Sequence, residues 1–479
     1  MLFNSFQFLV FFAVVFLVYF ALPHRWRWLL LLAASYYFYM CWRMEYILLI
    51  VFSTLVDYFA AWGIEKAPTR ARRKWWLAAS LATNFGLLFT FKYYNFFADS
   101  VRTAFQHFNI CQAVPELNVL LPVGISFYTF QTLSYTIDVY RGERPAERNL
   151  GIFSLYVAFF PQLVAGPIER STRLMPQFRR VVTFNETRAV TGLQLMLWGF
   201  FKKVVIADRL AQVVGPAYLT PRSASAFDLL LATVCFAFQI YCDFSAYSDI
   251  AIGAARILGF DLMENFRRPY LSKNIAEFWR RWHISLSTWF RDYLFIPLGG
   301  SRLSSGRTCF NLAVVFLLSG LWHGANWTFV VWGALHAVYM VAGRLARRRP
   351  SATGTPAAGL LAKAGQVLLT FVLVDFAWIF FRAATVSDAA HISRAVLLGF
   401  RHPLQEYILP AMSMTPVMLL AVGLIGLLLG LEILEQKLSL ADRFRRWPRP
   451  CRWAAYYAGA YAILLLGVLE NEAFIYFQF

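Results

Sequence analysis

Long apolar runs separated by short polar segments follow one another along almost the whole chain. The runs long enough to be considered as membrane crossings lie near residues 2–22, 26–41, 44–63, 75–97, 119–139, 191–214, 226–248, 360–381, 414–434 and 453–470. A helix rises 1.5 Å per residue, so roughly 20 apolar residues cross a hydrocarbon core about 30 Å thick. The pattern therefore predicts an all-α polytopic membrane protein in which residues 1–479 form a single membrane-embedded domain.

Two regions depart from simple crossings. The run at 150–165 has basic residues on both sides and is interrupted by Pro161, with Pro167 following, which predicts a re-entrant segment surrounded by protein. The short runs 309–322 and 327–343 are joined by Trp322-His323-Gly324-Ala325-Asn326. The first of these runs would cover only about 21 Å, so we expect the joint, and His323 with it, to lie below the membrane surface.

The stretch 256–307 is the least lipid-like part of the chain. It mixes nine basic residues with aromatic residues such as Phe278, Trp282 and Trp289. Because aromatic and basic side chains gather at membrane interfaces, the pattern predicts helices that lie at the cytoplasmic surface.

Composition and charge agree with a membrane protein. Hydrophobic residues make up 59% of the chain and charged residues only 15%, which exceeds what one soluble core would bury. The formal charge of +19 is divided among short clusters between apolar runs. Such clusters mark cytoplasmic loops and do not indicate nucleic-acid binding. The resulting topology places both chain termini outside the cytoplasm, and the six cysteines contain no CxxC pair that would predict a metal site.

Ionisable residues within apolar runs are candidates for function, because burying them in a membrane costs free energy. His323 stands out, since a neutral imidazole beside a glycine break can accept a proton from a hydroxyl group. The alternative is a hydrogen-bonded structural histidine. His336, thirteen residues further on, would be rotated by about 220° from His323 on a continuous helix, so we do not expect the two to act as a pair. The other candidates are Asp57, Lys92, Asp138, Lys202, Lys203, Asp208, Asp243, Asp249, Asp375 and Glu432.

The segment 278–293 contains His283 together with Arg280, Arg281 and Arg291. These arginines are suited to bind the phosphates of a large anionic donor such as coenzyme A, and Lys202 and Lys203 are candidates to add to that cationic mouth. An anchor for lipid headgroups is the alternative. No P-loop, HExxH, GxSxG or dinucleotide-binding motif is present, so the residues alone leave a transporter and a membrane enzyme equally open.

Several motifs resemble the membrane-bound O-acyltransferase family, in particular its bacterial branch that acetylates polysaccharides. The matching stretches are Leu121-Pro122-Val123-Gly124-Ile125-Ser126-Phe127, Val164-Ala165-Gly166-Pro167-Ile168, Tyr241-Cys242-Asp243-Phe244-Ser245-Ala246-Tyr247-Ser248-Asp249, residues 278–293, Pro297-Leu298-Gly299-Gly300 and Leu321-Trp322-His323-Gly324-Ala325-Asn326-Trp327. They cover roughly residues 1–345 in order, and the resemblance resumes at the end of the chain.

The resemblance implies a ring of about 10–12 transmembrane helices around a tunnel, with His323 as the family's catalytic histidine and His283 as its partner. It also implies acetyl-CoA as the acyl donor, a location in the bacterial inner membrane, and a polysaccharide acceptor such as alginate, peptidoglycan or cellulose. The expected protein partner is a periplasmic SGNH-type acetyltransferase or another polymer-modifying protein, and membrane lipids surround the chain.

The last residues, 471–479, resemble the C-terminal motif of the same branch and form the expected extracytoplasmic tail. In the related D-alanylation system the tyrosine of this motif is proposed to accept the acyl group, which makes Tyr476 a candidate acceptor here. An aromatic membrane-interface belt is the alternative for this tail.

The resulting hypothesis is an O-acetyltransferase that moves acetyl groups across the membrane. His323 is the expected general base, while His283 and the three arginines position the donor or support the oxyanion, with Asn326 as a further oxyanion candidate. The alternative is a transporter of an acetylated or lipid-linked intermediate, which predicts inverted repeats, and none is visible in the sequence.

Overall fold

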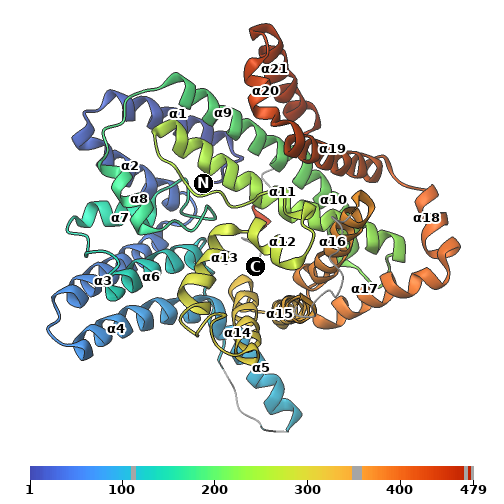
Figure 1. Ribbon diagram of the computed structural model, residues 1–479, viewed down its shortest axis with the longest axis horizontal. Helices are drawn as coiled ribbons and strands as arrows, with labels where there is room; N and C mark the ends of the chain where they lie inside the picture. The colour runs from blue at the N-terminus through green and yellow to red at the C-terminus, as the bar shows by residue number, and fades with distance from the viewer. Residues whose placement is uncertain (109, 111–114, 348–358, 469–472, 476–479) are drawn as a thin grey trace. The chain divides into compact units, whose positions relative to one another are not determined.

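A computed structural model describes residues 1–108, 110, 115–347, 359–468 and 473–475. Every regular element among these residues is helical (Figure 1). The chain divides into two compact units: unit 1 comprises Met1–Met196 and Ser248–Glu264, and unit 2 comprises Leu197–Tyr247 and Asn265–Gln478. Helices α9 (Glu186–Phe200) and α11 (Ala226–Leu258) each contribute residues to both units.

Unit 1 consists mainly of helices from the first half of the chain. They are α1 (Phe6–Ala21), α2 (His24–Met40), η1 (Met44–Tyr46), α3 (Ile47–Lys66), α4 (Arg70–Leu88), η2 (Phe89–Tyr93), α5 (Tyr94–His107), α6 (Ile125–Arg141), α7 (Leu150–Ala158), α8 (Ser171–Leu174) and η3 (Met175–Arg179). Between α3, α4 and α6 the buried Asp57 accepts hydrogen bonds from Ser80 Oγ (2.5 Å) and Asn84 Nδ2 (2.9 Å). This carboxylate therefore has a structural role inside the helix bundle, as buried polar groups require partners.

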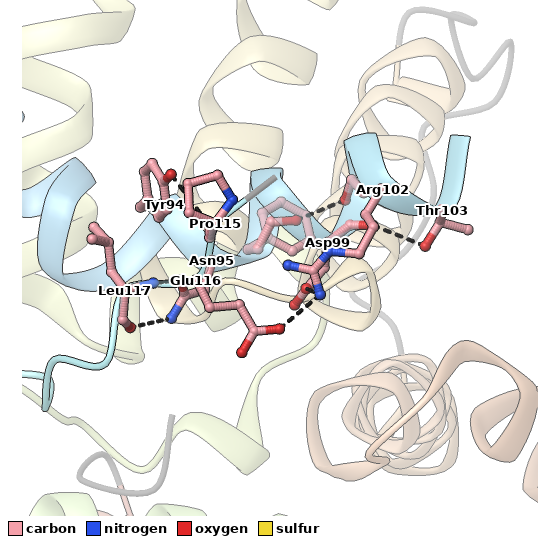
Figure 2. A network of polar contacts seen from close by, with 10 residues as sticks. Tyr94, Asn95, Asp99, Arg102, Thr103, Pro115, Glu116 and Leu117 are labelled. Atoms are coloured by element: carbon pink, nitrogen blue, oxygen red, sulfur yellow. Dashed lines mark hydrogen bonds and ion pairs between the residues drawn. The ribbon is translucent and has the colours of Figure 1, made fainter. Parts of the chain in front are cut away.

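A polar network joins α5 to the segment that follows it (Figure 2). Arg102 Nη1 lies 2.7 Å from Glu116 Oε1 and 3.3 Å from Asp99 Oδ1, and Asn95 Nδ2 donates to the Leu117 carbonyl at 2.9 Å. All of these residues are at least partly exposed, so the ion pairs contribute little to stability and serve mainly to fix the course of the chain.

The segment expected to be re-entrant has the structure that its prolines predict. Helix α7 ends at Ala158, and the irregular backbone from Phe159 to Glu169 is buried in unit 1 throughout. Irregular backbone at membrane depth requires surrounding protein that satisfies its polar groups. The burial of this segment meets that requirement.

Unit 2 holds the remaining helices. They are η4 (Phe201–Ala207), α10 (Asp208–Leu219), η5 (Pro269–Leu271), α12 (Ile275–Arg281), α13 (Ile284–Phe290), η6 (Arg291–Phe295), α14 (Ser305–His323), α15 (Trp327–Arg347), α16 (Leu360–Arg382), α17 (Val386–Leu398), η7 (Gly399–Arg401), η8 (Leu404–Ile408), α18 (Leu409–Met412), α19 (Pro416–Leu438), α20 (Leu440–Arg446) and α21 (Arg449–Leu466). The segment η4 is a π-helix that connects α9 to α10.

Helices α14 and α15 lie side by side and approach closely through glycines (Figure 1). A Cβ atom on Gly320 would lie 2.3 Å from the Phe329 carbonyl oxygen, and one on Gly333 would lie 2.4 Å from that of Phe316. Small residues let membrane helices pack backbone against backbone. The pair forms a tight hairpin whose turn carries the Trp322–Asn326 segment.

Six of the described helical segments are long and apolar enough to cross a membrane. They are Met44–Lys66, Glu186–Leu219, Ala226–Leu258, Trp327–Ala346, Leu360–Arg382 and Pro416–Leu438. The fold class predicted from the sequence, an all-α multi-pass membrane protein, is therefore confirmed.

Candidate active site

Both candidate histidines pack against the same indole ring in unit 2. The ring centroid of His323 lies 4.9 Å from that of Trp322, and the His283 centroid lies 5.9 Å from it. Each imidazole meets the indole edge-on, at interplanar angles of 80° and 63°. Residues forty positions apart in the sequence are thus brought to one aromatic side chain, as the resemblance implies for a shared site.

The end of α14 fixes the position of His323. His323 is the last residue of the helix and is 97% buried, and its ring also contacts Trp332 (5.0 Å) and Phe381 (5.3 Å). The next residue must be small, because a Cβ atom on Gly324 would lie 2.1 Å from the Phe329 ring. The glycine that follows the histidine therefore lets the chain turn directly into α15.

The backbone at His283 adopts an uncommon conformation. His283 lies between α12 and α13 with φ 42° and ψ 56°, in the left-handed region that few residues other than glycine occupy. Asn265 holds this turn at two points, since its carbonyl accepts from the Ile284 amide at 2.9 Å and its side-chain oxygen accepts from the Ser285 amide at 3.2 Å. Backbone strain of this kind is concentrated at functional sites.

The same contacts define the protonation of His283. A backbone N–H can only donate, so the Asn265 atom facing the Ser285 amide must be the oxygen Oδ1. That oxygen lies 3.2 Å from His283 Nδ1, which must therefore carry the proton. Complete burial lowers the pKa of His283 to about 3 by desolvation. The ring is neutral at physiological pH, and Nε2 carries the lone pair.

His336 lies closer to His323 than a continuous helix would allow. His336 and His323 both pack against Trp332, at 4.8 Å and 5.0 Å between ring centroids. Helix α14 ends at His323, and the chain turns back into α15, which carries His336. The rotation calculated for a continuous helix therefore does not apply. His336 nevertheless has a structural partner, because Trp279 Nε1 donates to His336 Nδ1 at 3.3 Å.

The three candidate arginines are in different electrostatic states. Arg281 is paired with Glu277 at 2.6 Å, and Arg291 with Asp292 at 2.7 Å. Arg280 is exposed and has no ion pair with any residue that the structure describes. Arg280 is therefore the member of the set whose charge is available to a phosphate group.

The structure corrects two expectations about charge and aromatic residues in unit 2. Lys202 and Lys203 are buried, with Lys203 Nζ 2.8 Å from both Asp208 Oδ1 and Asp243 Oδ1 and Lys202 Nζ donating to Ser245 Oγ at 2.7 Å. They are not part of an exposed cationic mouth.

Most of the large aromatic residues of 256–307, expected at a lipid interface, are also buried within the protein. A mixture of arginine and aromatic residues in a sequence does not distinguish these two environments.

The Asn326 side chain caps helix α15. Its Oδ1 accepts from the Thr328 amide at 3.0 Å, and its Nδ2 donates to the Ala384 carbonyl at 3.0 Å. Both polar groups of the amide are engaged in this way, which favours a capping role over the predicted oxyanion role.

The C-terminal tail is only partly described. Tyr476 lies outside the described residues, but Phe474 and Ile475 are buried in unit 2, at 4% and 2% exposure. The Phe474 ring lies 5.6 Å from Phe244, whose ring lies 4.6 Å from His283. The described part of the tail therefore reaches the aromatic surroundings of the site.

Asn265 is a residue of the site that the sequence pattern does not predict. It lies in irregular chain between α11 and η5, where neither periodicity nor a motif marks it. The available signal was weak: a neutral amide in a stretch dominated by charged and aromatic residues.

Comparisons with known proteins identify the family of the chain. The sequence profile of the membrane-bound O-acyltransferase family matches residues 147–384. The probable alginate O-acetylase AlgI of Pseudomonas aeruginosa is 42% identical over 83% of this chain and 75% of its own length. The peptidoglycan O-acetyltransferase of Helicobacter pylori is 36% identical over 77% of this chain and 73% of its own length. A teichoic acid D-alanyltransferase of Bacillus subtilis is 28% identical over 47% of this chain and 60% of its own length.

The helical fold and these comparisons define a multi-pass membrane acyltransferase. The chain belongs to the membrane-bound O-acyltransferase family.

Proposed function

We propose that this protein is an O-acetyltransferase that takes acetyl groups from cytoplasmic acetyl-CoA and passes them across the bacterial inner membrane to an extracytoplasmic polysaccharide. The observation that carries the proposal is the convergence of His283 and His323 on Trp322 within unit 2. The similar proteins include a probable alginate O-acetylase and a peptidoglycan O-acetyltransferase, and their names support a polysaccharide acceptor. A periplasmic SGNH-type acetyltransferase or a similar protein completes the transfer.

His323 acts as the general base. It takes the proton from an acceptor hydroxyl while that oxygen attacks the thioester carbonyl carbon of acetyl-CoA. The carbon–sulfur bond then breaks, and the coenzyme A thiolate takes the proton back from the imidazolium as it leaves. The aromatic rings of Trp322, Trp332 and Phe381 around the imidazole exclude water, which protects the thioester from hydrolysis.

His283 positions the reacting groups through Nε2. Since Nδ1–H is committed to Asn265, a neutral His283 presents a hydrogen-bond acceptor and not a donor. Oxyanion support from Nε2 would require the other tautomer. The geometry therefore favours a role in orienting a hydroxyl or thiol hydrogen of the substrate.

We expect Asn265→Ala to lower kcat by about tenfold or more at unchanged KM, because the tautomer and orientation of His283 are lost. Asn265→Asp retains the accepting oxygens and should recover part of the activity. Ser285→Ala is the matched control, since it removes another donor to the same oxygen and leaves the His283 contact intact. Steady-state kinetics on purified protein distinguish these outcomes, and equal losses in Asn265→Ala and Ser285→Ala would refute the tautomer role.

The donor side offers a second prediction. Arg280→Gln should raise KM for acetyl-CoA by about tenfold with little change in kcat, because a lost charge-assisted contact to phosphate mainly weakens binding. Arg291→Gln is the control: its guanidinium is paired with Asp292, and we expect a smaller change. The defect of Arg280→Gln should be relieved at high donor concentration. A loss confined to kcat would instead place Arg280 at the reacting centre or in the fold.

The proposed function is tested with purified protein in liposomes and acetyl-CoA labelled in the acetyl group. An acetyltransferase releases coenzyme A thiol and leaves label on protein or polymer, both dependent on His323. Movement of label across the membrane without thiol release would favour the transporter alternative.

A further inference from the structure

A cluster of charged side chains is buried inside unit 2. Lys203 Nζ lies 2.8 Å from Asp208 Oδ1 and 2.8 Å from Asp243 Oδ1, and all three side chains are at most 8% exposed. Lys203 belongs to the π-helix η4, Asp208 begins α10, and Asp243 lies in the middle of α11. Burying three charges is costly, and π-helical turns are frequent at functional sites. The acyl-transfer steps described above use none of these groups.

The C-terminal segment attaches to this cluster. The Ile475 amide donates to Asp243 Oδ2 at 2.7 Å. Earlier in the segment, the Val468 amide donates to the Val204 carbonyl at 2.9 Å, and Arg209 Nε donates to the Leu466 carbonyl at 2.8 Å. The end of α21 and the chain after it are thus bonded to η4, α10 and α11. The bond to α11 is made to a carboxylate that Lys203 also contacts.

Ile475 is buried, and the residue before it packs against aromatic rings of α11. The Phe474 ring packs on Tyr247 at 5.1 Å and on Phe244 at 5.6 Å between centroids. Phe244 in turn contacts His283 at 4.6 Å. One aromatic ring therefore separates the docked tail from a candidate site residue.

We propose that Lys203 and Asp243 form a latch that docks the C-terminal tail, and that they are positioning residues for the acyl transfer. Lys203 engages one oxygen of Asp243 and so directs the other oxygen toward the Ile475 amide. A hydrogen bond to an ionised acceptor is stronger than a neutral one, and the buried amide has to be satisfied. Tyr476 is covalently bonded to Ile475, so fixing this amide restricts the region that the tyrosine can reach. The role of the latch in acyl transfer rests on the proposed function, whereas the docking of the tail does not depend on it.

The Asp243→Asn variant tests the latch because it changes the number of hydrogen-bond acceptors that the side chain offers. The amide in Asp243→Asn has a single oxygen, and the Lys203 ammonium has only donors to offer it. With that oxygen turned to Lys203, the amide nitrogen faces the Ile475 N–H, and two donors oppose each other. Asp208→Asn is the matched control, because it changes the charge around the same lysine and leaves the bond from the Ile475 amide to Asp243 in place.

Carboxypeptidase trimming of the purified protein, followed by intact mass, reports the docking directly. We expect residues up to and including Ile475 to be removed about tenfold faster in Asp243→Asn than in wild type, since one charge-assisted bond is lost. Asp208→Asn should remain within about twofold of wild type. Ile475→Pro deletes the donor on the tail without altering the charged cluster, and it is compared in acetyl transfer because proline itself resists carboxypeptidases. Ile475→Ala keeps the N–H, so we expect its trimming to be slower than that of Asp243→Asn.

The two readouts separate this inference from the proposed function. In acetyl transfer, Asp243→Asn and Ile475→Pro should each lower kcat by about tenfold with unchanged KM for acetyl-CoA, and the double variant should be no worse than either alone. Unchanged trimming in Asp243→Asn at wild-type thermal stability overturns the latch, whatever the transfer shows. Faster trimming with undiminished acetyl transfer overturns the positioning role of Lys203 and Asp243. Equal rates of trimming in Asp243→Asn and Asp208→Asn would show that the charged cluster contributes only to packing and does not dock the tail.

Discussion

We expect His323→Ala to lower acetyl transfer by about 10²- to 10⁴-fold, the range that general-base catalysis supplies. Alanine cannot accept the proton of the acceptor hydroxyl, so transfer is lost even when both substrates are bound. His323 lies at the end of α14 and contributes its ring, but no helix-interior backbone, to the packing around Trp322 and Trp332. The protein should therefore still insert and reach normal abundance in the membrane.

A packing control is available for this variant within the same aromatic cluster. His336 is also buried and also contacts Trp332, yet its imidazole is hydrogen-bonded to Trp279. We expect His336→Gln to retain transfer within about tenfold, because it loses packing but no catalytic proton acceptor. Quantitative mass spectrometry of the membrane fraction and release of coenzyme A thiol give the two measurements. Transfer by His323→Ala within about tenfold of wild type would remove His323 as the base.

The sequence predicts the crossings near 44–63, 191–214, 226–248, 360–381 and 414–434 because each depends on local composition. The other five predicted runs have no counterpart among the described segments that are long and apolar enough to cross a membrane. The run near 226–248 becomes α11, Ala226–Leu258, and the run near 360–381 becomes α16, Leu360–Arg382. A helix that must satisfy its own backbone groups in lipid needs only length and apolar side chains. The sequence pattern does not predict helices α17 and α18, because neither is long enough to form an apolar run that could cross a membrane.

The site itself is predicted less completely. His323 is recognisable because its glycine-flanked break is a local feature of the sequence. The partners that determine its chemistry are not local: Trp332 follows the turn, and Phe381 comes from α16. The protonation of His283 depends on Asn265, eighteen residues earlier, and on the direction of a single backbone amide. Such contacts require the folded chain.

The two lysines of η4 are a second example of residues whose environment depends on contacts that are distant in the sequence. Adjacent Lys202 and Lys203 after an apolar run predict a basic surface feature, and the structure buries both. Their partners, Ser245 and Asp243, lie about forty residues further along the chain in α11. A charge pattern along one segment cannot show that a carboxylate from another helix neutralises it.

Tyr476→Phe should stop acetylation of the polymer as completely as His323→Ala. We propose that the Tyr476 phenol is the first acyl acceptor: its proton passes to His323, its oxygen attacks the acetyl carbonyl, and coenzyme A leaves as the thiol. A tyrosine phenol ordinarily has a pKa near 10, so it needs such a base to react at neutral pH. Phenylalanine keeps the ring and its packing but removes the nucleophilic oxygen, which separates a relay from an aromatic anchor.

Tyr461→Phe is the matched control for this change, because it removes a phenol from the exposed face of α21 and should leave transfer unchanged. Wild-type protein incubated with acetyl-CoA should carry an alkali-labile acetyl group on its C-terminal peptide, and Tyr476→Phe should not. In Asp243→Asn this acetylated peptide should form more slowly, because an undocked tail brings the phenol to the thioester less often. Polymer acetylation at the wild-type rate in Tyr476→Phe would show that the acetyl group passes directly to another acceptor, with His323 still serving as the base for that transfer.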